Sequence, residues 1–498
     1  MRGICRHWIW SLCTLLLLVI ATPLRAADHD RWYALQMQGQ RAGWMHTSQR
    51  TAGDRITSMS EMHMKIRRGE VTVDISISSE FVETVDGRPV SGKSSMAMAS
   101  MPNVTEYIFK DGQVEVHTGN GATKSMAVQP LPEGAWLTPA ASAMFVSKRL
   151  EAGAEDIVVR TLDTTTGLTA VTSTYKVLER TTVEALGKVV PAIKWSATSD
   201  IQPDIETVGY VDERGVPIRT EIDMGGIKMV IVLADRELAK LDINAPELMN
   251  STFVEPKGKI HEPRKLRRAS YLLSVPEGRI GDLPSAGPQI VTRVNERTLR
   301  VVVDLDAKTA ADTDDGGKLE YRRPSQMINS EDEVVARLTK DALAGINEGN
   351  HAARAEALRN AVFKHIKDKS FGVGFASAAE VARTCTGDCS EHAALLTAML
   401  RNAGYASRTA SGLVFVDQFA GRQGIFGYHM WSQVLLETDG TQRWIDLDAT
   451  MPAGRDFGAG GFDATHITIA VASLADGESI NGLVTLAPLL GRLEITVE

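Results

Sequence analysis

The sequence predicts an α+β protein, with an N-terminal region of antiparallel β-structure followed by a region of mixed helices and strands. Up to about residue 238, short alternating segments are separated by turn sequences such as Asp86-Gly87 and Asn120-Gly121. After about residue 330 the period of the apolar residues changes from two to 3.6, which indicates helices. From Arg408 the strand pattern returns. A chain of 498 residues is long enough for two or three domains.

The first 26 residues have the features of an export signal. Arg2 and Arg6 precede an apolar run over residues 8–20, and residues 24–26 (Leu-Arg-Ala) offer a cleavage site. The run is shorter than the roughly 20 residues that a membrane-spanning helix needs. We therefore expect cleavage near Ala26 and an exported protein, periplasmic or secreted, with no stable membrane span.

The charge and the cysteines restrict the function further. The formal net charge is −8, and it becomes −11 once residues 1–26, with three arginines and no acidic residue, are removed. An acidic protein is not expected to bind nucleic acid, which calls for a basic surface. Only Cys385 and Cys389 remain in the mature chain, so no disulfide framework is expected and these thiols need another explanation.

Residues 27–250 are predicted to form an antiparallel β domain with one helix, which the apolar residues between Pro139 and Ala152 allow. The opening strand with Trp32-Tyr33 and the turn at Gly43-Trp44 resemble the curved half-barrel of outer-membrane lipoprotein carriers. Eight methionines lie between residues 37 and 101. On a strand, Met62 and Met64 point to the face opposite His63, so they are predicted to line an apolar core. The alternatives are a copper site or an apolar, lipid-like or peptide ligand held inside the sheet.

A smaller strand-rich segment is predicted over residues 251–306, with its clearest strand at residues 300–304. Residues 307–329 are rich in Asp and Gly and are predicted to be a linker. The C-terminal domain, residues 330–498, opens with Ser330 and Glu333 spaced as a helix capping box. Asn350 and Ser377 are predicted to cap two further helices, and Asp388 a fourth that ends at Gly404.

Cys389 is predicted to be the first residue of that fourth helix. The free N–H groups and the positive end of the helix dipole favour a thiolate there and could hold an oxyanion. If residues 439–440 (Asp-Gly) form a two-residue hairpin turn, Trp431 lies opposite Asp448 and His429 opposite Thr450. His429 and Asp448 then share one face, one diagonal step apart, as a base and its orienting carboxylate require. Asp446 has the same parity but lies opposite Gln433, farther from His429.

Three blocks of the C-terminal domain resemble the transglutaminase-like superfamily. They are residues 387–393 (Gly-Asp-Cys-Ser-Glu-His-Ala) with 401–405 (Arg-Asn-Ala-Gly-Tyr), residues 427–431 (Gly-Tyr-His-Met-Trp), and residues 444–452 (Trp-Ile-Asp-Leu-Asp-Ala-Thr-Met-Pro). The resemblance covers about residues 330–498 and implies a papain-like core. Residues 404–408 keep the ends of the family's Gly-Ile-Pro-Ala-Arg stretch and lose its proline. No acidic cluster resembles the calcium sites of the animal crosslinking enzymes.

The resemblance implies that Cys389 is the nucleophile, His429 the base and Asp448 its orienter, with no metal and no cofactor. It also implies a protein or peptide amide as the substrate, attacked in acyl transfer or in hydrolysis. Trp431, Tyr428 and His392 are candidate substrate-binding residues. Trp431 could instead fill the core, and His392 could be structural.

Three alternatives to this hypothesis remain. Cys385, Cys389 and His392 could bind a metal, although their spacing matches no standard zinc pattern. Cys385 and Cys389 could form a disulfide, which would block the nucleophile. The domain could also be a catalytically silent scaffold, with the β domain carrying the function by binding a ligand.

Overall fold

The computed structural model describes most of the chain after residue 27. The described residues are 28–98, 102–119, 125–165, 167–185, 187–213, 215–224, 226–307, 316–370, 376–438, 440–452, 462–475, 489 and 491–498. They divide into two compact units, one up to Leu248 and one from Met249 onward. The expected export signal and its cleavage site near Ala26 lie outside the described residues. Within the described part of the chain, no helix combines the length and the apolar character that crossing a bilayer requires.

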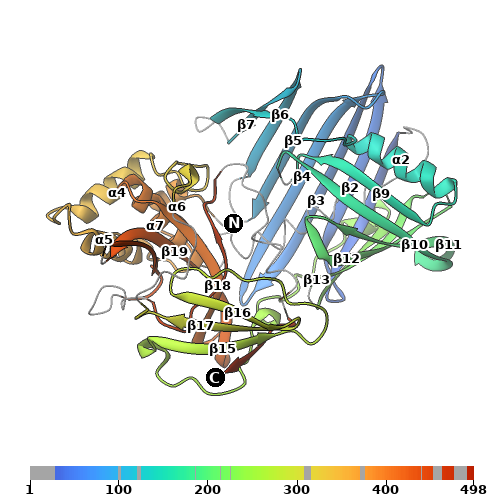
Figure 1. The fold of residues 1–498 in the computed structure, drawn as a ribbon. Helices are drawn as coiled ribbons and strands as arrows, with labels where there is room; N and C mark the ends of the chain where they lie inside the picture. The colour runs from blue at the N-terminus through green and yellow to red at the C-terminus, as the bar shows by residue number, and fades with distance from the viewer. Residues whose placement is uncertain are drawn as a thin grey trace. The chain divides into compact units, whose positions relative to one another are not determined.

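The first unit is built on an antiparallel sheet (Figure 1) in which fourteen described strands follow the order β8-β7-β6-β5-β4-β3-β2-β1-β14-β13-β12-β11-β10-β9. Almost every strand therefore pairs with its neighbour in sequence, as expected where short turns join alternating segments. The strands are β1 (His29–Met37), β2 (Gln40–Ala52), β3 (Arg55–Arg68), β4 (Val71–Thr84), β5 (Pro89–Met98), β6 (Asn103–Lys110), β7 (Gln113–Thr118), β8 (Ser125–Pro130), β9 (Asp156–Asp163), β10 (Thr169–Ala185), β11 (Lys188–Ser199), β12 (Gln202–Val211), β13 (Pro217–Met224) and β14 (Ile227–Ala234).

The sheet is curved enough to bring its β9 edge back toward β5. A Cβ atom at Gly92 of β5 would lie 3.2 Å from the hydroxyl oxygen of Thr164, the residue that follows β9. Helix α2 (Pro139–Glu151), the helix expected in this region, connects β8 to β9. A short helix, α3 (Arg236–Ala239), follows β14 and is capped by Asp235.

Several methionines of the first unit lie in its core. Met45 and Met62 lie opposite each other on β2 and β3, and both are fully buried. Met64 is also buried, whereas His63 stacks on Trp44 with ring centroids 5.7 Å apart. The thioethers and the imidazole therefore point to opposite faces, as the strand parity predicted, and they are not arranged as one copper site.

The second unit contains two four-stranded sheets. The first has the order β16-β17-β15-β22 and the second the order β20-β19-β18-β21. Their strands are β15 (Arg268–Ser274), β16 (Gln289–Asn295), β17 (Thr298–Asp304), β18 (Ser407–Phe419), β19 (Arg422–Thr438), β20 (Thr441–Leu447), β21 (Ile467–Ala472) and β22 (Glu494–Val497). The helices are α4 (Glu333–Leu343), α5 (His351–His365), α6 (Ala378–Thr384) and α7 (Cys389–Asn402).

Three of the four expected helix caps in this unit are confirmed. The side chains of Asn350, Ser377 and Asp388 accept hydrogen bonds from the first turns of α5, α6 and α7. The expected cap at Ser330 is wrong. Asp332 caps α4 instead, accepting a hydrogen bond from the N–H of Val334 at 2.9 Å, because a carboxylate stands directly before the first helical turn.

Segments before residue 330 form part of the second unit. Strand β15 pairs with the C-terminal strand β22, and Val254 pairs with Phe426 of β19. Tyr321, in the segment expected to be a linker, packs edge-on against Trp444 of β20 with ring centroids 5.1 Å apart. The strand-rich segment and the end of the expected linker therefore contribute to the same core as the helices.

Candidate active site

The start of α7 holds Cys389 as its first residue, half-buried and not bonded to another cysteine. Asp388 Oδ1 accepts a hydrogen bond from the N–H of Ser390 at 2.9 Å, and Glu391 Oε2 accepts one from the N–H of Asp388 at 2.8 Å. This reciprocal capping box fixes where the helix begins. It also occupies N–H groups of the first turn that the sequence analysis expected to be free for an oxyanion.

Two residues after Cys389, Glu391 is completely buried. Its Oε1 accepts a hydrogen bond from the N–H of Ala376 at 2.9 Å, which ties the segment before α6 to α7. Burial and the neighbouring Asp388 carboxylate raise the pKa of Glu391 well above its ordinary value. The carboxyl group of Glu391, two residues after Cys389, is therefore protonated more easily than an exposed glutamate.

His429 and Asp448 come together as a hydrogen-bonded pair. His429 Nε2 lies 2.7 Å from Asp448 Oδ2, and both side chains are buried. Asp448 Oδ1 accepts hydrogen bonds from the N–H of Thr450 at 2.8 Å and from its hydroxyl at 2.7 Å. Because Asp448 engages Nε2, the other ring nitrogen of His429, Nδ1, is the one left for proton transfer.

Burial alone would raise the pKa of Asp448. The charge and hydrogen bond of His429, together with a second histidine, His466, instead hold that pKa well below its ordinary value. Asp448 is therefore ionised over the whole physiological range and acts as a permanent acceptor for His429.

The start of α7 and the segment after Asp448 are held together by the same loop. Asp368 forms a β-bridge with Thr386, three residues before Cys389. The next residue, Lys369, donates a hydrogen bond from Nζ to the carbonyl oxygen of Thr450 at 3.3 Å. Farther along, the Ser432 hydroxyl of β19 donates to the carbonyl oxygen of Ala393 on α7 at 3.0 Å. Helix α7 thus lies along the strand that carries His429.

The hairpin register agrees with the prediction. Thr438 pairs with Thr441 and Gln433 with Asp446. Asp446 is not directed at His429: its Oδ1 accepts hydrogen bonds from Trp431 Nε1 at 2.6 Å and from Gln433 Nε2 at 2.7 Å. Burial raises the pKa of Asp446 to about 6. Asp446 on β20 and Asp448 just after it therefore have different hydrogen-bond partners.

The expected substrate-binding residues are more buried than a substrate contact requires. Trp431 is fully buried, and its ring stacks on that of His429 at a centroid distance of 6.0 Å. His392 is 1% exposed, and its Nδ1 bonds to the carbonyl oxygen of Asp388 at 2.6 Å. Tyr428 is half-buried, and its hydroxyl has no hydrogen-bond partner among the described residues. Trp431 and His392 are therefore buried beside His429 and Asp388, and a role of these residues in substrate binding stays a prediction.

The two cysteines are not arranged for a disulfide or a shared metal. Cys385 caps the end of α6 with a left-handed backbone, and its sulfur lies 3.5 Å from His365 Nε2. Neither of the two described cysteines is in a disulfide, and His392 Nδ1 bonds to a backbone carbonyl oxygen. The sites that the sequence left open for Cys385, Cys389 and His392 are thus not formed in this structure.

His466 and Asp463 were missed by the sequence analysis. His466 Nε2 lies 3.4 Å from Asp448 Oδ2, the same oxygen that His429 contacts. Asp463 Oδ1 accepts hydrogen bonds from the N–H and the hydroxyl of Thr465, which repeats the turn of Asp448 with Thr450. The signal in the sequence was the repeated Asp-Ala-Thr, at residues 448–450 and again at 463–465, just before the histidine.

The nearest ring atoms of His429 and His466 and an oxygen of Asp448 lie within 4.8 Å of one another, close enough to hold a metal ion. The hydrogen-bond pattern favours protons there instead. His429 Nε2 and Asp448 Oδ2 are at hydrogen-bond distance, and His466 faces acceptors with both ring nitrogens. A ring that is protonated on both nitrogens has no lone pair to offer a metal.

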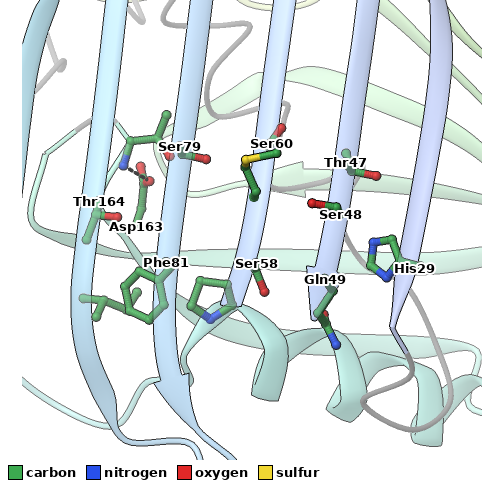
Figure 2. Close-up of a pocket in the computed structure, with 14 residues that line it drawn as sticks. His29, Thr47, Ser48, Gln49, Ser58, Ser60, Ser79, Phe81, Asp163 and Thr164 are labelled. Atoms are coloured by element: carbon green, nitrogen blue, oxygen red, sulfur yellow. Dashed lines mark hydrogen bonds between the residues drawn. The ribbon is translucent and has the colours of Figure 1, made fainter. Parts of the chain in front are cut away.

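The first unit contains a pocket of a different kind (Figure 2). Thr47, Ser60 and Ser79 lie directly opposite one another on β2, β3 and β4, so their hydroxyls form a row across the sheet. The cavity encloses about 30 Å³, which is room for about two water molecules. Its lining combines these hydroxyls with apolar groups such as Phe81 and Leu162. The apolar ligand that the sequence analysis left open as an alternative for this unit stays a prediction.

Comparison with known families agrees with the geometry. Residues 339–449 match the model of the transglutaminase-like superfamily. The C-terminal region is a transglutaminase-like domain. The match includes Cys389, His429 and Asp448 and ends before Asp463 and His466. No curated protein matches the chain in sequence.

Two solved structures are among those similar to the chain. A β-barrel-like protein of the DUF1849 group from Brucella abortus has 13% sequence identity and a TM-score of 0.33, covering 42% of this chain and 97% of that one. The periplasmic domain of TgpA from Pseudomonas aeruginosa, solved with ethylmercury, has 15% identity and a TM-score of 0.26, covering 40% of this chain and 88% of that one. With TM-scores this low, neither likeness assigns a function to the transglutaminase-like domain.

Proposed function

We propose that the transglutaminase-like domain is a thiol enzyme in which Cys389, His429 and Asp448 act together on the amide of a protein or peptide. The observation that carries the proposal is the buried 2.7 Å contact between His429 and Asp448, made by a carboxylate that stays ionised. This contact leaves His429 Nδ1 free to exchange a proton with a thiol. A half-buried cysteine at the N-terminus of a capped helix supplies that thiol.

In the proposed reaction, the thiol proton of Cys389 passes to His429 and the sulfur attacks the carbonyl carbon. The positive end of α7 stabilises the negative charge that develops on the carbonyl oxygen. Collapse of this intermediate breaks the carbon–nitrogen bond, and His429 returns the proton to the leaving amine. Water or a second amine then attacks the thioester, which releases the acid or a new amide and regenerates the thiol.

Alkylation of the full-length mature protein with iodoacetamide, followed by mapping of the modified peptide, tests this proposal. We expect Cys389 to react much faster than Cys385 at neutral pH, because Cys389 begins a helix and His429 is its proposed base. Cys385 instead follows the C-terminal end of α6, and the ring nitrogen beside it, His365 Nε2, already faces the carbonyl oxygen of Ala382 at 2.9 Å. His429→Ala should slow labelling of Cys389 by about 10²-fold or more. Cys385→Ser is the matched control and should leave the labelling rate of Cys389 unchanged.

Equal and slow labelling of both cysteines, insensitive to His429→Ala, would contradict the proposal and favour a silent scaffold. Once Cys389 is shown to be activated, incorporation of a fluorescent primary amine into casein distinguishes transfer from hydrolysis. Release of free peptide carboxylate without amine incorporation would identify a hydrolase.

We also propose that the protein acts after export. The features of residues 1–26 support this proposal: a positive start, a short apolar run and a small residue at position 26. Mass spectrometry of the protein recovered from a producing cell should find a mature chain that begins near residue 27. An intact N-terminus on exported material would contradict cleavage at this site.

A further inference from the structure

Asp448 has a second imidazole partner besides His429. Its Oδ2 lies 2.7 Å from His429 Nε2 and 3.4 Å from His466 Nε2, so one carboxylate oxygen faces both rings. The rings of the two histidines have centroids 5.9 Å apart. His466 is fully buried, which means that it cannot exchange its partner for bulk water.

The hydrogen-bond pattern determines the protonation of His466. Its Nε2 faces a carboxylate oxygen, and its Nδ1 lies 3.1 Å from the backbone carbonyl oxygen of Asp463. Both partners can only accept hydrogen bonds, so both ring nitrogens carry hydrogens and the ring is positively charged. Burial alone would lower the pKa of His466, but the hydrogen bonds and charges of Asp448 and Asp463 raise it to about 9.

The charged groups around His466 balance one another. Asp448 and Asp463 face its two sides, and Arg264 Nη1 pairs with Asp463 Oδ2 at 2.7 Å. Asp446 on β20 also feels the charge of His466, while Phe462 stacks on its ring at 4.2 Å. With His466 protonated, its buried ring and the exposed Arg264 guanidinium offset the charges of two buried carboxylates, Asp448 and Asp463.

The turn that carries His466 is fixed by the segment that precedes the family match. Gln289 bonds to the N–H of Thr468 at 2.8 Å and to its carbonyl oxygen at 2.7 Å. The Tyr271 hydroxyl donates to the carbonyl oxygen of Ala464 at 3.0 Å. The N–H of Ala464 in turn donates to the carbonyl oxygen of Leu266 at 2.8 Å. These contacts hold His466 at a set distance from Asp448.

We propose that His466 is a positioning residue, kept protonated by Asp448 and Asp463, which holds the Asp448 carboxylate against His429. This inference rests on the proposed thiol chemistry. By contacting Asp448, His466 fixes the rotamer of this carboxylate, which in turn orients the proposed base His429. Its positive charge also lies close to His429, with the two ring centroids 5.9 Å apart, and repels a positive charge placed there.

The test is the pH dependence of alkylation of Cys389 by iodoacetate, an anionic reagent whose rate falls when the positive charge on His429 is lost. His466→Gln keeps an N–H donor toward Asp448 and removes the positive charge of the ring. The pH at which the alkylation rate falls, at the alkaline side of the profile, should therefore rise by on the order of one pH unit. His466→Ala should also lower the plateau rate by about tenfold or more, and by more than His466→Gln does, because the hydrogen bond is lost. His261→Gln, an exposed histidine of the same unit, is the matched control and should reproduce the wild-type profile.

A His466→Gln profile that superimposes on the wild type would overturn the inference while leaving the proposed function intact. Absence of activated Cys389 in the wild type would overturn both. Where a His466 variant fails to fold, nitrogen-15 NMR of the histidine rings in the Cys389→Ser protein decides instead. We expect both ring nitrogens of His466 to be protonated at pH 7; a neutral His466 ring would refute the assignment.

Discussion

At the scale of single residues, the candidate site depends on how two nearby carboxylates are surrounded. Asp448 faces two histidines and is held ionised, whereas Asp446 accepts hydrogen bonds only from neutral groups, Trp431 and Gln433. Burial raises the pKa of Asp446 to about 6, and the hydrogen bonds from Trp431 and Gln433 and the charges of His466 and Arg408 offset it only in part; the pKa of Asp448 is lowered instead. Strand parity alone could not distinguish their environments, because both side chains point to the same face.

This difference predicts a pH-dependent cost of folding at Asp446. The pKa of Asp446 is about 6 in the folded protein, against an ordinary value of 3.8, so the folded state binds this proton more tightly than the unfolded chain does. Proton binding at Asp446 therefore contributes its full stabilisation below about pH 4. That stability is lost as the pH rises through 6. The wild type loses this stability between pH 4 and pH 7, but Asp446→Asn does not. The unfolding free energy of the variant, relative to that of the wild type, should therefore rise by on the order of 2 kcal/mol over this range.

Chemical denaturation over this pH range measures the gain. Asp417→Asn, which removes an exposed carboxylate from β18, is the control for the loss of one charge. A difference between Asp446→Asn and the wild type that stays constant with pH would show that Asp446 is ionised at little cost.

At the scale of secondary-structure elements, the sequence predicted those features that depend on interactions between residues close together in the chain, namely the helix caps and the β19–β20 hairpin. The caps Asn350, Ser377 and Asp388 were identified because each is bonded within its own first helical turn. The β19–β20 register followed from its two-residue turn. The pairing of β18 with β21 and of β15 with β22 joins segments far apart in sequence, and no local pattern specifies such a register. His466, which precedes β21, was missed for that reason.

Gly412 of β18 shows how closely these distant strands approach. It pairs with His429 on one side and with Thr468 of β21 on the other, next to an irregularity in the β18–β21 register. A Cβ atom there would lie 1.8 Å from the carbonyl oxygen of Ile467, a backbone atom that cannot move alone. Gly412→Ala should therefore displace β21, cost about 1–3 kcal/mol of stability and slow the alkylation of Cys389, because His466 is displaced with the strand.

Thermal unfolding and iodoacetamide labelling check both effects of this substitution. The matched control is Gly427→Ala on the neighbouring strand β19, where a Cβ atom would meet only the ring of Phe253 at 3.8 Å. Equal stability and equal labelling rates for the two variants would contradict the tight approach of β18 to β21.

At the scale of the whole molecule, the folding unit of the transglutaminase-like domain extends beyond the family match. The match covers residues 339–449, yet the compact unit begins at Met249. Its C-terminal strand β22 pairs with β15, and Glu498 forms an ion pair with Arg300 of β17 at 2.7 Å. The helix periodicity that begins near residue 330 predicted a domain boundary there, because a change of period marks a change of secondary structure. The change of period does not indicate with which earlier strand a later strand, such as β22, pairs.

A chain of residues 249–498 should therefore fold by itself, whereas residues 330–498 should not. The shorter chain leaves β22 without a partner strand and Asp463 without Arg264, and it removes the Gln289 amide that holds Thr468. An uncompensated buried carboxylate and an unpaired strand are each costly, so no stable core is expected.

Circular dichroism during denaturation should show one cooperative transition for residues 249–498, with Cys389 labelled as in the full-length protein. Residues 28–248, a unit of similar length, serve as the control for truncation itself. Cooperative unfolding and rapid Cys389 labelling in residues 330–498 would show instead that the strands before residue 307 are dispensable for the site.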